Sequence, residues 1–259
     1  MSAAMGGSID AFYEGMTEKK ILHMLMQRGL LAKVNLCDGK ETGKTEVNRR
    51  LRDVVGPNVG TKQVRCLVLR DLDERETMER IKQGLQTALQ ALYRERGHPK
   101  AVVRFVRHRA HGNVYLHTCT ELDVRVALHI ATYRHLPDFC KSTIDDYVLR
   151  VALHHETAAA LIKRQGWSIS SKRIIHKVTS EIPALLKQNG IPMMGEAKDF
   201  IHFYAALLRV HTSPAVFAEK ILHHAPESEL REVFAPLRAA AEFLQDASSP
   251  SMPGDRLPA

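Results

Sequence analysis

The sequence has few cysteines and no long apolar run, and both shortages exclude classes of protein. Its four cysteines are scattered, and no two of them form a C-x-x-C pair. This spacing argues against a zinc ribbon and against a disulfide framework, and it indicates a reducing cytoplasm. No stretch approaches about 18 consecutive apolar residues, so no transmembrane helix is predicted. The first residues do not combine a basic segment with an apolar one, so we expect no secretory signal and no membrane association.

The rest of the composition is that of an ordinary globular protein. Among 259 residues, 44% are apolar and 25% are charged, which excludes wholesale disorder. A chain of this length can bury a sizeable core without disulfides or metals. Its 37 Lys and Arg against 29 Asp and Glu give a net charge of +8. An excess of positive charge is a feature of nucleic-acid-binding proteins, and it is a weak signal when it stands alone.

The first half alternates apolar runs with helical patterns. Strands are predicted over residues 8–13, 31–37, 64–69 and 101–106, and helices over 18–29, 45–55 and 76–96. Alternation of this kind favours an α/β fold with a parallel sheet and helices on both faces.

After residue 145 the chain shows only helical periodicity, interrupted by prolines. We therefore predict four segments: a flexible N-terminal segment over 1–7, an α/β catalytic domain over 8–130, an all-helical domain over 131–246, and a disordered tail over 247–259.

Acidic side chains follow two of the predicted strands. Glu14 ends the first strand, and Asp71 and Asp73 end the third. Ligands of open parallel sheets lie beyond the carboxyl ends of the strands. Carboxylates two residues apart in a strand point the same way and repel each other unless a cation lies between them. Glu18 lies one helical turn after Glu14 and can point back at the same site. Oxygen ligands of this kind suit Mg²⁺ or Mn²⁺.

These motifs resemble those of a known family. Y-E-G-M-T-E (13–18) resembles the glutamate motif of TOPRIM domains, and L-R-D-L-D (69–73) resembles their D-x-D motif. The strand and helix order between the motifs also matches. The E-x-x-x-[DE] form of the first motif is most similar to the small nucleases of the OLD type. The resemblance covers roughly residues 8–130, and it implies a TOPRIM-like open parallel sheet and Mg²⁺-dependent cleavage of phosphodiesters.

The resemblance also implies roles for individual residues. Glu14, Asp71 and Asp73 would carry the metal, and Glu18 would bind a second metal. OLD-type nucleases place an acidic residue after the following strand, and the best match is Glu121 in T-E-L-D. They place a catalytic lysine further on, which Lys198 in G-E-A-K matches. The sequence departs from the subfamily at Leu69, where a small polar residue is frequent, and this departure bears on the second metal.

Two alternative interpretations concern the D-x-D segment and the segment 38–45. Asp71 and Asp73 can be a helix N-cap and part of a surface loop, with the acidic residues after them interacting favourably with the helix dipole.

Residues 38–45, D-G-K-E-T-G-K-T, resemble the phosphate loop of an NTPase. That loop requires G-x-x-x-x-G-K-[ST], and its first glycine would fall on Asp38. An acid at this position repels phosphate, so a polar turn is the simpler interpretation.

Basic residues crowd the fourth predicted strand and the loop after it. Arg104, Arg107 and Arg109 form a positive strip that can hold the phosphate backbone of a nucleic acid. The alternative is an edge strand that its charges protect from pairing with other chains.

The sequence therefore predicts a cytoplasmic, metal-dependent endonuclease that uses Mg²⁺ or Mn²⁺ to activate water against DNA or RNA. By resemblance, small proteins of this kind often act with an ABC-type ATPase in antiviral defence or repair, and self-association is a further expectation. A non-catalytic TOPRIM-like subunit that binds nucleic acid or serves as a scaffold is the alternative, followed by an NTPase.

Overall fold

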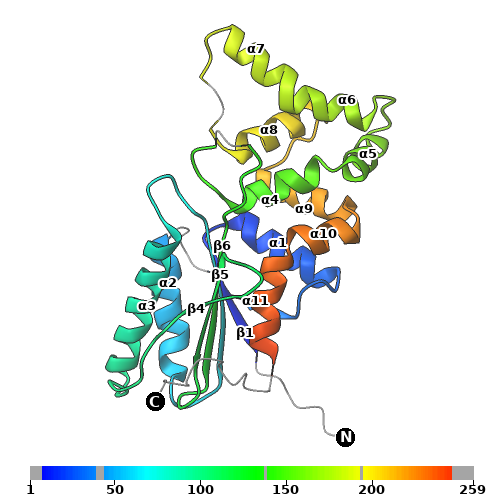
Figure 1. The fold of residues 1–259 in the computed structure, drawn as a ribbon. Coiled ribbons are helices and arrows are strands. Elements are labelled where there is room, and N and C mark those ends of the chain that lie inside the picture. Colours follow the sequence, from blue (N-terminus) through cyan, green and yellow to red (C-terminus); the bar gives the residue numbers. More distant parts are fainter. Residues whose placement is uncertain (1–7, 39–43, 137–138, 193–194, 247–259) are drawn as a thin grey trace, which may run out of the picture.

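The computed structural model describes residues 8–38, 44–136, 139–192 and 195–246, and in these ranges six strands form one sheet (Figure 1). The strands are β1 (Ile9–Phe12), β2 (Val34–Leu36), β3 (Val64–Arg70), β4 (Val106–Arg107), β5 (Val114–Cys119) and β6 (Val124–Ile130). Their order across the sheet is β2-β1-β3-β6-β5-β4. The first four strands in this order are parallel, and β5 and β4 continue the sheet in antiparallel pairs. The predicted α/β class and a mostly parallel sheet are confirmed.

Helices cover both faces of the sheet. On one face lie α2 (Lys44–Val55), which continues into a short 3₁₀ turn (Gly56–Asn58), and α3 (Met78–Glu95). On the other face lie α1 (Met16–Gln27) and α11 (Ala235–Gln245), as Figure 1 shows. The two central strands β3 and β6 are buried along their whole length, because a parallel strand with helices on both sides meets no solvent.

The remaining helices gather beyond the carboxyl ends of the parallel strands (Figure 1). They are α4 (Ile144–Ala152), α5 (His155–Arg164), α6 (Ser171–His176), a π-helical turn (Lys177–Glu181), α7 (Ile182–Gln188), α8 (Ala197–Leu207), α9 (Pro214–His224) and α10 (Glu227–Val233). Apart from those of α7, their apolar residues join one hydrophobic cluster with Leu67, Leu69 and Ala127 of the sheet. The segments predicted as 8–130 and 131–246 therefore share a core.

The fourth predicted strand, residues 101–106, is wrong in extent. Ala101, Val103 and Phe105 are buried in alternation with exposed neighbours, as in a strand. The side chain of Gln90 on α3 takes the place of a neighbouring strand: its Nε2 donates to the carbonyl of Ala101 at 2.7 Å, and its Oε1 accepts from the amide of Val103 at 2.9 Å. Pairing with β5 begins only at Val106.

The sequence analysis did not identify β5 and β6. They form an antiparallel hairpin whose turn includes Asp123 in a left-handed conformation, with φ of 48°. β6 then pairs in parallel with β3, so that Val64 lies opposite Val124 and Arg70 opposite Ile130. This register brings the chain after Ile130 to the same edge of the sheet as Asp71.

The four cysteines are free. Across the described ranges, no helix has the length and apolar character needed to cross a bilayer. The predicted segments 1–7 and 247–259 lie outside the described residues.

The buried centre of β3 supplies a test of the fold. Leu67→Ala removes a side chain with no exposed surface, and we expect it to lower the free energy of unfolding by about 2–5 kcal/mol. Val102→Ala is the matched control, because Val102 is 72% exposed and its truncation should change stability by less than about 0.5 kcal/mol. Urea unfolding measures both variants. Equal effects would contradict the placement of β3.

Candidate functional site

Carboxylates from three parts of the chain meet beyond the carboxyl ends of β1 and β3. Glu14 follows β1, Glu18 lies in the first turn of α1, and Asp71 follows β3. Asp145 joins them from the first turn of α4. The charges of Glu14 and Asp145 act on the pKa values of Glu18 and Asp71, and the charge of Glu18 acts on that of Asp71. We call these four residues the acidic cluster. It contains three of the five predicted metal ligands.

Backbone contacts position the glutamates. The guanidinium of Arg50 is buried and donates from Nη2 to the carbonyl of Tyr13 at 2.7 Å, which fixes the chain directly before Glu14. Gly15 then leaves room for Glu18 to fold back, since a Cβ at Gly15 would lie 3.3 Å from Glu18 Oε2. Glu18 is 5% exposed.

The end of β3 is tied to the start of α4. Leu72 and Ser142 exchange two backbone hydrogen bonds, of 2.8 and 2.9 Å. Asp71 Oδ1 accepts a hydrogen bond of 2.9 Å from the amide of Ile144, the first residue of α4. An acidic side chain at a helix N-terminus is favoured by the helix dipole. The alternative interpretation of Asp71 as the N-cap of the following helix is wrong, because Thr77 is the N-cap of α3 and Thr143 that of α4.

Asp145 was not identified from the sequence. Thr143 and Asp146 form a capping box at the start of α4, in which Asp146 Oδ2 accepts from the amide of Thr143 at 2.9 Å. Asp145 takes no part in this cap. Its Oδ1 is buried and has no hydrogen-bond partner. The sequence signal is a pair of adjacent acids at a helix start, of which the cap uses only one.

Burial and crowding favour the protonated forms of these carboxyls. Burial raises the pKa of Glu18 to about 7, and the charges of Asp145 and Glu14 act in the same direction. Burial, with Glu18 and Glu14, raises the pKa of Asp71 well above its ordinary value. Burial raises the pKa of Asp145 to about 6, although the charge of Lys198 opposes this. Without a cation, the cluster is therefore stabilised by protons near neutral pH.

The donor set fits a hard divalent cation. Four carboxylates supply oxygen ligands, and the buried Asp145 Oδ1 lacks a partner that a cation would provide. Among the described residues, no three Asp, Glu, His or Cys side chains are arranged around one point as metal ligands. Two members of the cluster are directed elsewhere: Asp71 toward Ile144, and Glu14 toward Arg70, whose Nε lies 2.5 Å from Glu14 Oε1.

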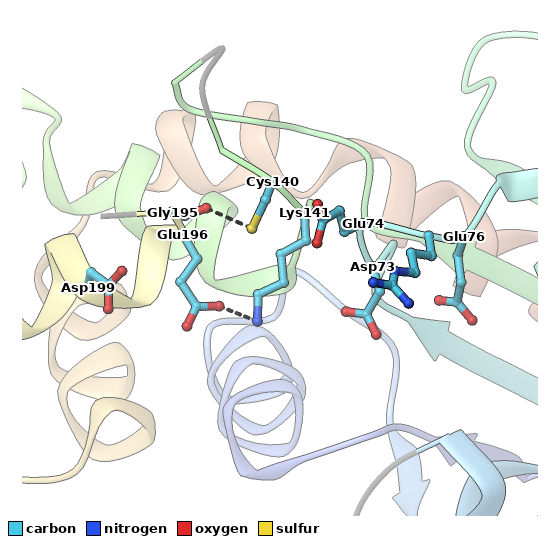
Figure 2. Close-up of a pocket in the computed structure, with 9 residues that line it drawn as sticks. Asp73, Glu74, Glu76, Cys140, Lys141, Gly195, Glu196 and Asp199 are labelled. Carbon is cyan, nitrogen blue, oxygen red and sulfur yellow. Dashed lines mark hydrogen bonds and ion pairs between the residues drawn. The ribbon is translucent and has the colours of Figure 1, made fainter. Parts of the chain in front are cut away.

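Asp73 lines a cavity of about 630 Å³ together with Lys141 and Glu196. Figure 2 shows Lys141 extending between Glu196 and Asp73 in this cavity, and Lys141 forms an ion pair with Glu196. Burial opposes a charged Lys141, but the hydrogen bond and charge of Glu196, with the charge of Asp73, raise its pKa. The ammonium group of Lys141 is therefore a positively charged neighbour of Asp73.

The two residues predicted further along the chain have different outcomes. The charge of Lys198, in the first turn of α8, opposes the rise in the pKa of Asp145, so this lysine lies near one member of the acidic cluster. Glu121 lies in the turn between β5 and β6. This turn precedes β6, which runs parallel to β3, so Glu121 is a strand length of roughly 20 Å from Asp71. The structure corrects this assignment, because Glu121 is at the opposite end of the sheet from the acidic cluster.

The basic strip lies at the edge of the sheet. Arg107 on β4 pairs with Tyr115, which pairs with Leu128, which lies opposite Val68. Arg107 is therefore at the end of the sheet where the acidic cluster lies, and three strand spacings of about 4.8 Å separate β4 from β3. Arg104 lies further from that end, because its amide contacts the ring of His117, which pairs with Val126 opposite Cys66. Arg104, Arg107 and Arg109 are exposed. This position is compatible with both interpretations of the strip.

The segment that resembles a phosphate loop is only partly described, since residues 39–43 lie outside the described ranges. At its mouth, Asp38 accepts hydrogen bonds from the hydroxyl of Tyr13 and from Lys19 Nζ. The carboxylate of Asp38 thus links β1 and α1.

The raised pKa values predict a dependence of stability on pH. Between about pH 4.5 and pH 7, the unfolded chain releases protons that folded Glu18 retains. The free energy of unfolding of the metal-free protein should therefore fall as pH rises through this window, by on the order of 2 kcal/mol from this group. Glu18→Gln should flatten the curve, and Glu79→Gln, at an exposed position, should not. Melting curves from pH 4.5 to 8 measure the slope. An unchanged slope in Glu18→Gln would contradict the burial of a protonated carboxyl.

Comparisons with known proteins give little further information. No protein-family model matches the chain, and no curated protein matches it. Among solved structures, the hypothetical protein PH0156 from Pyrococcus horikoshii OT3 is similar with a TM-score of 0.49 and 13% sequence identity, over 92% of this chain and 97% of that chain.

Proposed function

We propose that the protein is a metal-dependent nuclease that hydrolyses phosphodiester bonds of nucleic acid. The observation that carries this proposal is the acidic cluster: four carboxylates crowd together at the ends of two parallel strands and the start of α4, and one buried oxygen of Asp145 has no partner. Crowded, buried carboxylates destabilise a fold unless they bind a cation or are protonated.

The residues divide into ligands and supporting groups. Glu14, Glu18, Asp71 and Asp145 would hold Mg²⁺ or Mn²⁺, which supplies a water of lowered pKa and neutralises charge on a phosphoryl oxygen. Lys198 lies near Asp145, where its ammonium can contact a phosphate oxygen. Asp73, in the cavity that Lys141 also lines, is in a position to orient water or a substrate group through Lys141.

A TOPRIM-like catalytic domain of the OLD type is part of the proposal. In its support, the two motifs end neighbouring parallel strands, β1 and β3, and α1 follows the glutamate motif directly. Asp145 follows β6, which is the next parallel strand. The substrate, DNA or RNA, would extend from the cluster toward the basic strip. In the cytoplasm, such a nuclease would act as an effector of antiviral defence or repair, with an ABC-type ATPase as partner or in a self-associated form.

A second candidate is a non-catalytic subunit that binds nucleic acid. It is favoured by the structural roles that two of the carboxylates have in the metal-free protein. Asp71 binds the amide of Ile144, and Glu14 binds Arg70. Both contacts stabilise the fold without any cation.

Cleavage of nucleic acid with Mg²⁺ or Mn²⁺ separates the two candidates. Glu14→Gln and Asp71→Asn each remove one carboxylate of the cluster. Each should lower the rate of cleavage at least about a hundredfold, because the remaining carboxylates bind the cation more weakly. Glu121→Gln is the matched control at the opposite end of the sheet and should cleave at the wild-type rate. Melting curves establish that each variant is folded. Wild-type cleavage in both cluster variants, or none in the wild type, would favour the non-catalytic subunit.

The basic strip supplies an independent test. If Arg104, Arg107 and Arg109 contact phosphates, the affinity for duplex DNA should fall with salt, with a log–log slope of roughly 0.9 per contact. Replacing the three arginines by Ala should lower this slope by up to about three contacts. It should leave Mn²⁺ affinity unchanged, because salt screens charges beyond about 8 Å. Affinity across a salt series measures the effect. An unaltered slope would identify the strip as a solvated edge of the sheet.

A further inference from the structure

Arg70 places a positive charge inside the candidate site. It is the last residue of β3, directly before Asp71, and its side chain is 9% exposed. Its Nε lies 2.5 Å from Glu14 Oε1, and its Nη2 lies 3.7 Å from Glu76 Oε1. A buried guanidinium keeps its charge, so it is stabilised by anionic partners or by other hydrogen-bond acceptors. In the metal-free protein, Glu14 is the nearer of these partners.

Glu14 also belongs to the acidic cluster. Its charge acts on both Glu18 and Asp71, and its Oε1 contacts the guanidinium, so its carboxylate is near both. A divalent cation bound by the cluster would draw on this same carboxylate, and its charge would repel the guanidinium, whose Nε lies 2.5 Å from Glu14 Oε1. Arg70 and the cation therefore compete for Glu14.

We propose that Arg70 is a built-in counter-cation that exchanges Glu14 for a substrate phosphate when a divalent cation binds. This inference rests on the proposed function. In the metal-free protein, Arg70 neutralises Glu14. When the cluster binds the cation, Glu14 turns to it and leaves the guanidinium with Glu76. Planar donors then face the site, and a phosphodiester is the anion that a guanidinium binds best with two parallel hydrogen bonds.

Titration with Mn²⁺ tests the competition directly. Arg70→Gln removes the competing charge, and we expect the metal-free full chain to bind Mn²⁺ about tenfold more tightly, as measured by calorimetry. Arg65→Gln is the matched control: Arg65 is also buried on β3, 7% exposed, but pairs with Asp123 at the opposite end of the strand, at 2.6 Å. It should bind Mn²⁺ with wild-type affinity.

Binding of a short single-stranded oligonucleotide tests the second half of the exchange. With Mn²⁺ at saturation, Arg70→Gln should bind the oligonucleotide about tenfold more weakly, although it binds the metal more tightly. Arg70→Lys keeps the charge but not the planar donors, so it should bind Mn²⁺ as the wild type does and the oligonucleotide more weakly. Should Arg70→Gln not fold, the lysine variant still tests the phosphate contact.

The outcomes distinguish this inference from the proposed function. If the wild type binds Mn²⁺ and Arg70→Gln binds it equally or more weakly, the exchange is wrong and the metal site stands. If Arg65→Gln gains as much affinity as Arg70→Gln, the gain is a general charge effect and the exchange is also wrong. If neither the wild type nor Arg70→Gln binds Mn²⁺, the proposed function fails together with the inference. Unchanged oligonucleotide binding in Arg70→Lys would overturn the phosphate contact.

Discussion

The bond from the amide of Ile144 to Asp71 Oδ1 links the two halves of the molecule at one point. It connects the central strand of the sheet to the first helix of the helical half, and the paired backbones of Leu72 and Ser142 reinforce it. Together with the shared hydrophobic core, this connection places Asp145 near Glu14 and Glu18. The acidic cluster is therefore a product of tertiary structure, although the motifs at residues 13–18 and 69–73 are local.

The charge of the molecule is unevenly distributed. A chain with a net charge of +8 gathers four carboxylates in one buried place and keeps exposed arginines at the same end of the sheet. The arginines attract an anionic polymer over a distance, whereas the carboxylates repel it at close range unless they are neutralised. In the proposed function, a positively charged ion or a proton at the cluster would therefore be needed before a phosphate could approach. Arg70 already neutralises part of this charge within the fold.

The sequence predicted those features that depend on local pattern. The strands that end at Glu14 and Asp71 were recognisable because each is a short apolar run followed by an acid, and adjacent parallel strands bring such ends together. The β5–β6 hairpin was missed, and with it the register that carries the chain back to the site. The prediction for Glu121 failed for this reason, since its position depends on the direction of β5 and β6. Asp145 was missed because its partners are distant in sequence, and its neighbour Asp146 explains the helix start by itself.

The Gln90 side chain has a consequence for how the molecule behaves among its own copies. By occupying the carbonyl of Ala101 and the amide of Val103, it satisfies backbone groups on a stretch whose alternating burial is that of a strand. Unsatisfied groups of this kind are the template on which neighbouring chains add strands and aggregate. The side chain of Gln90 therefore blocks strand addition at these two backbone groups. We expect it to lower the tendency of the protein to aggregate.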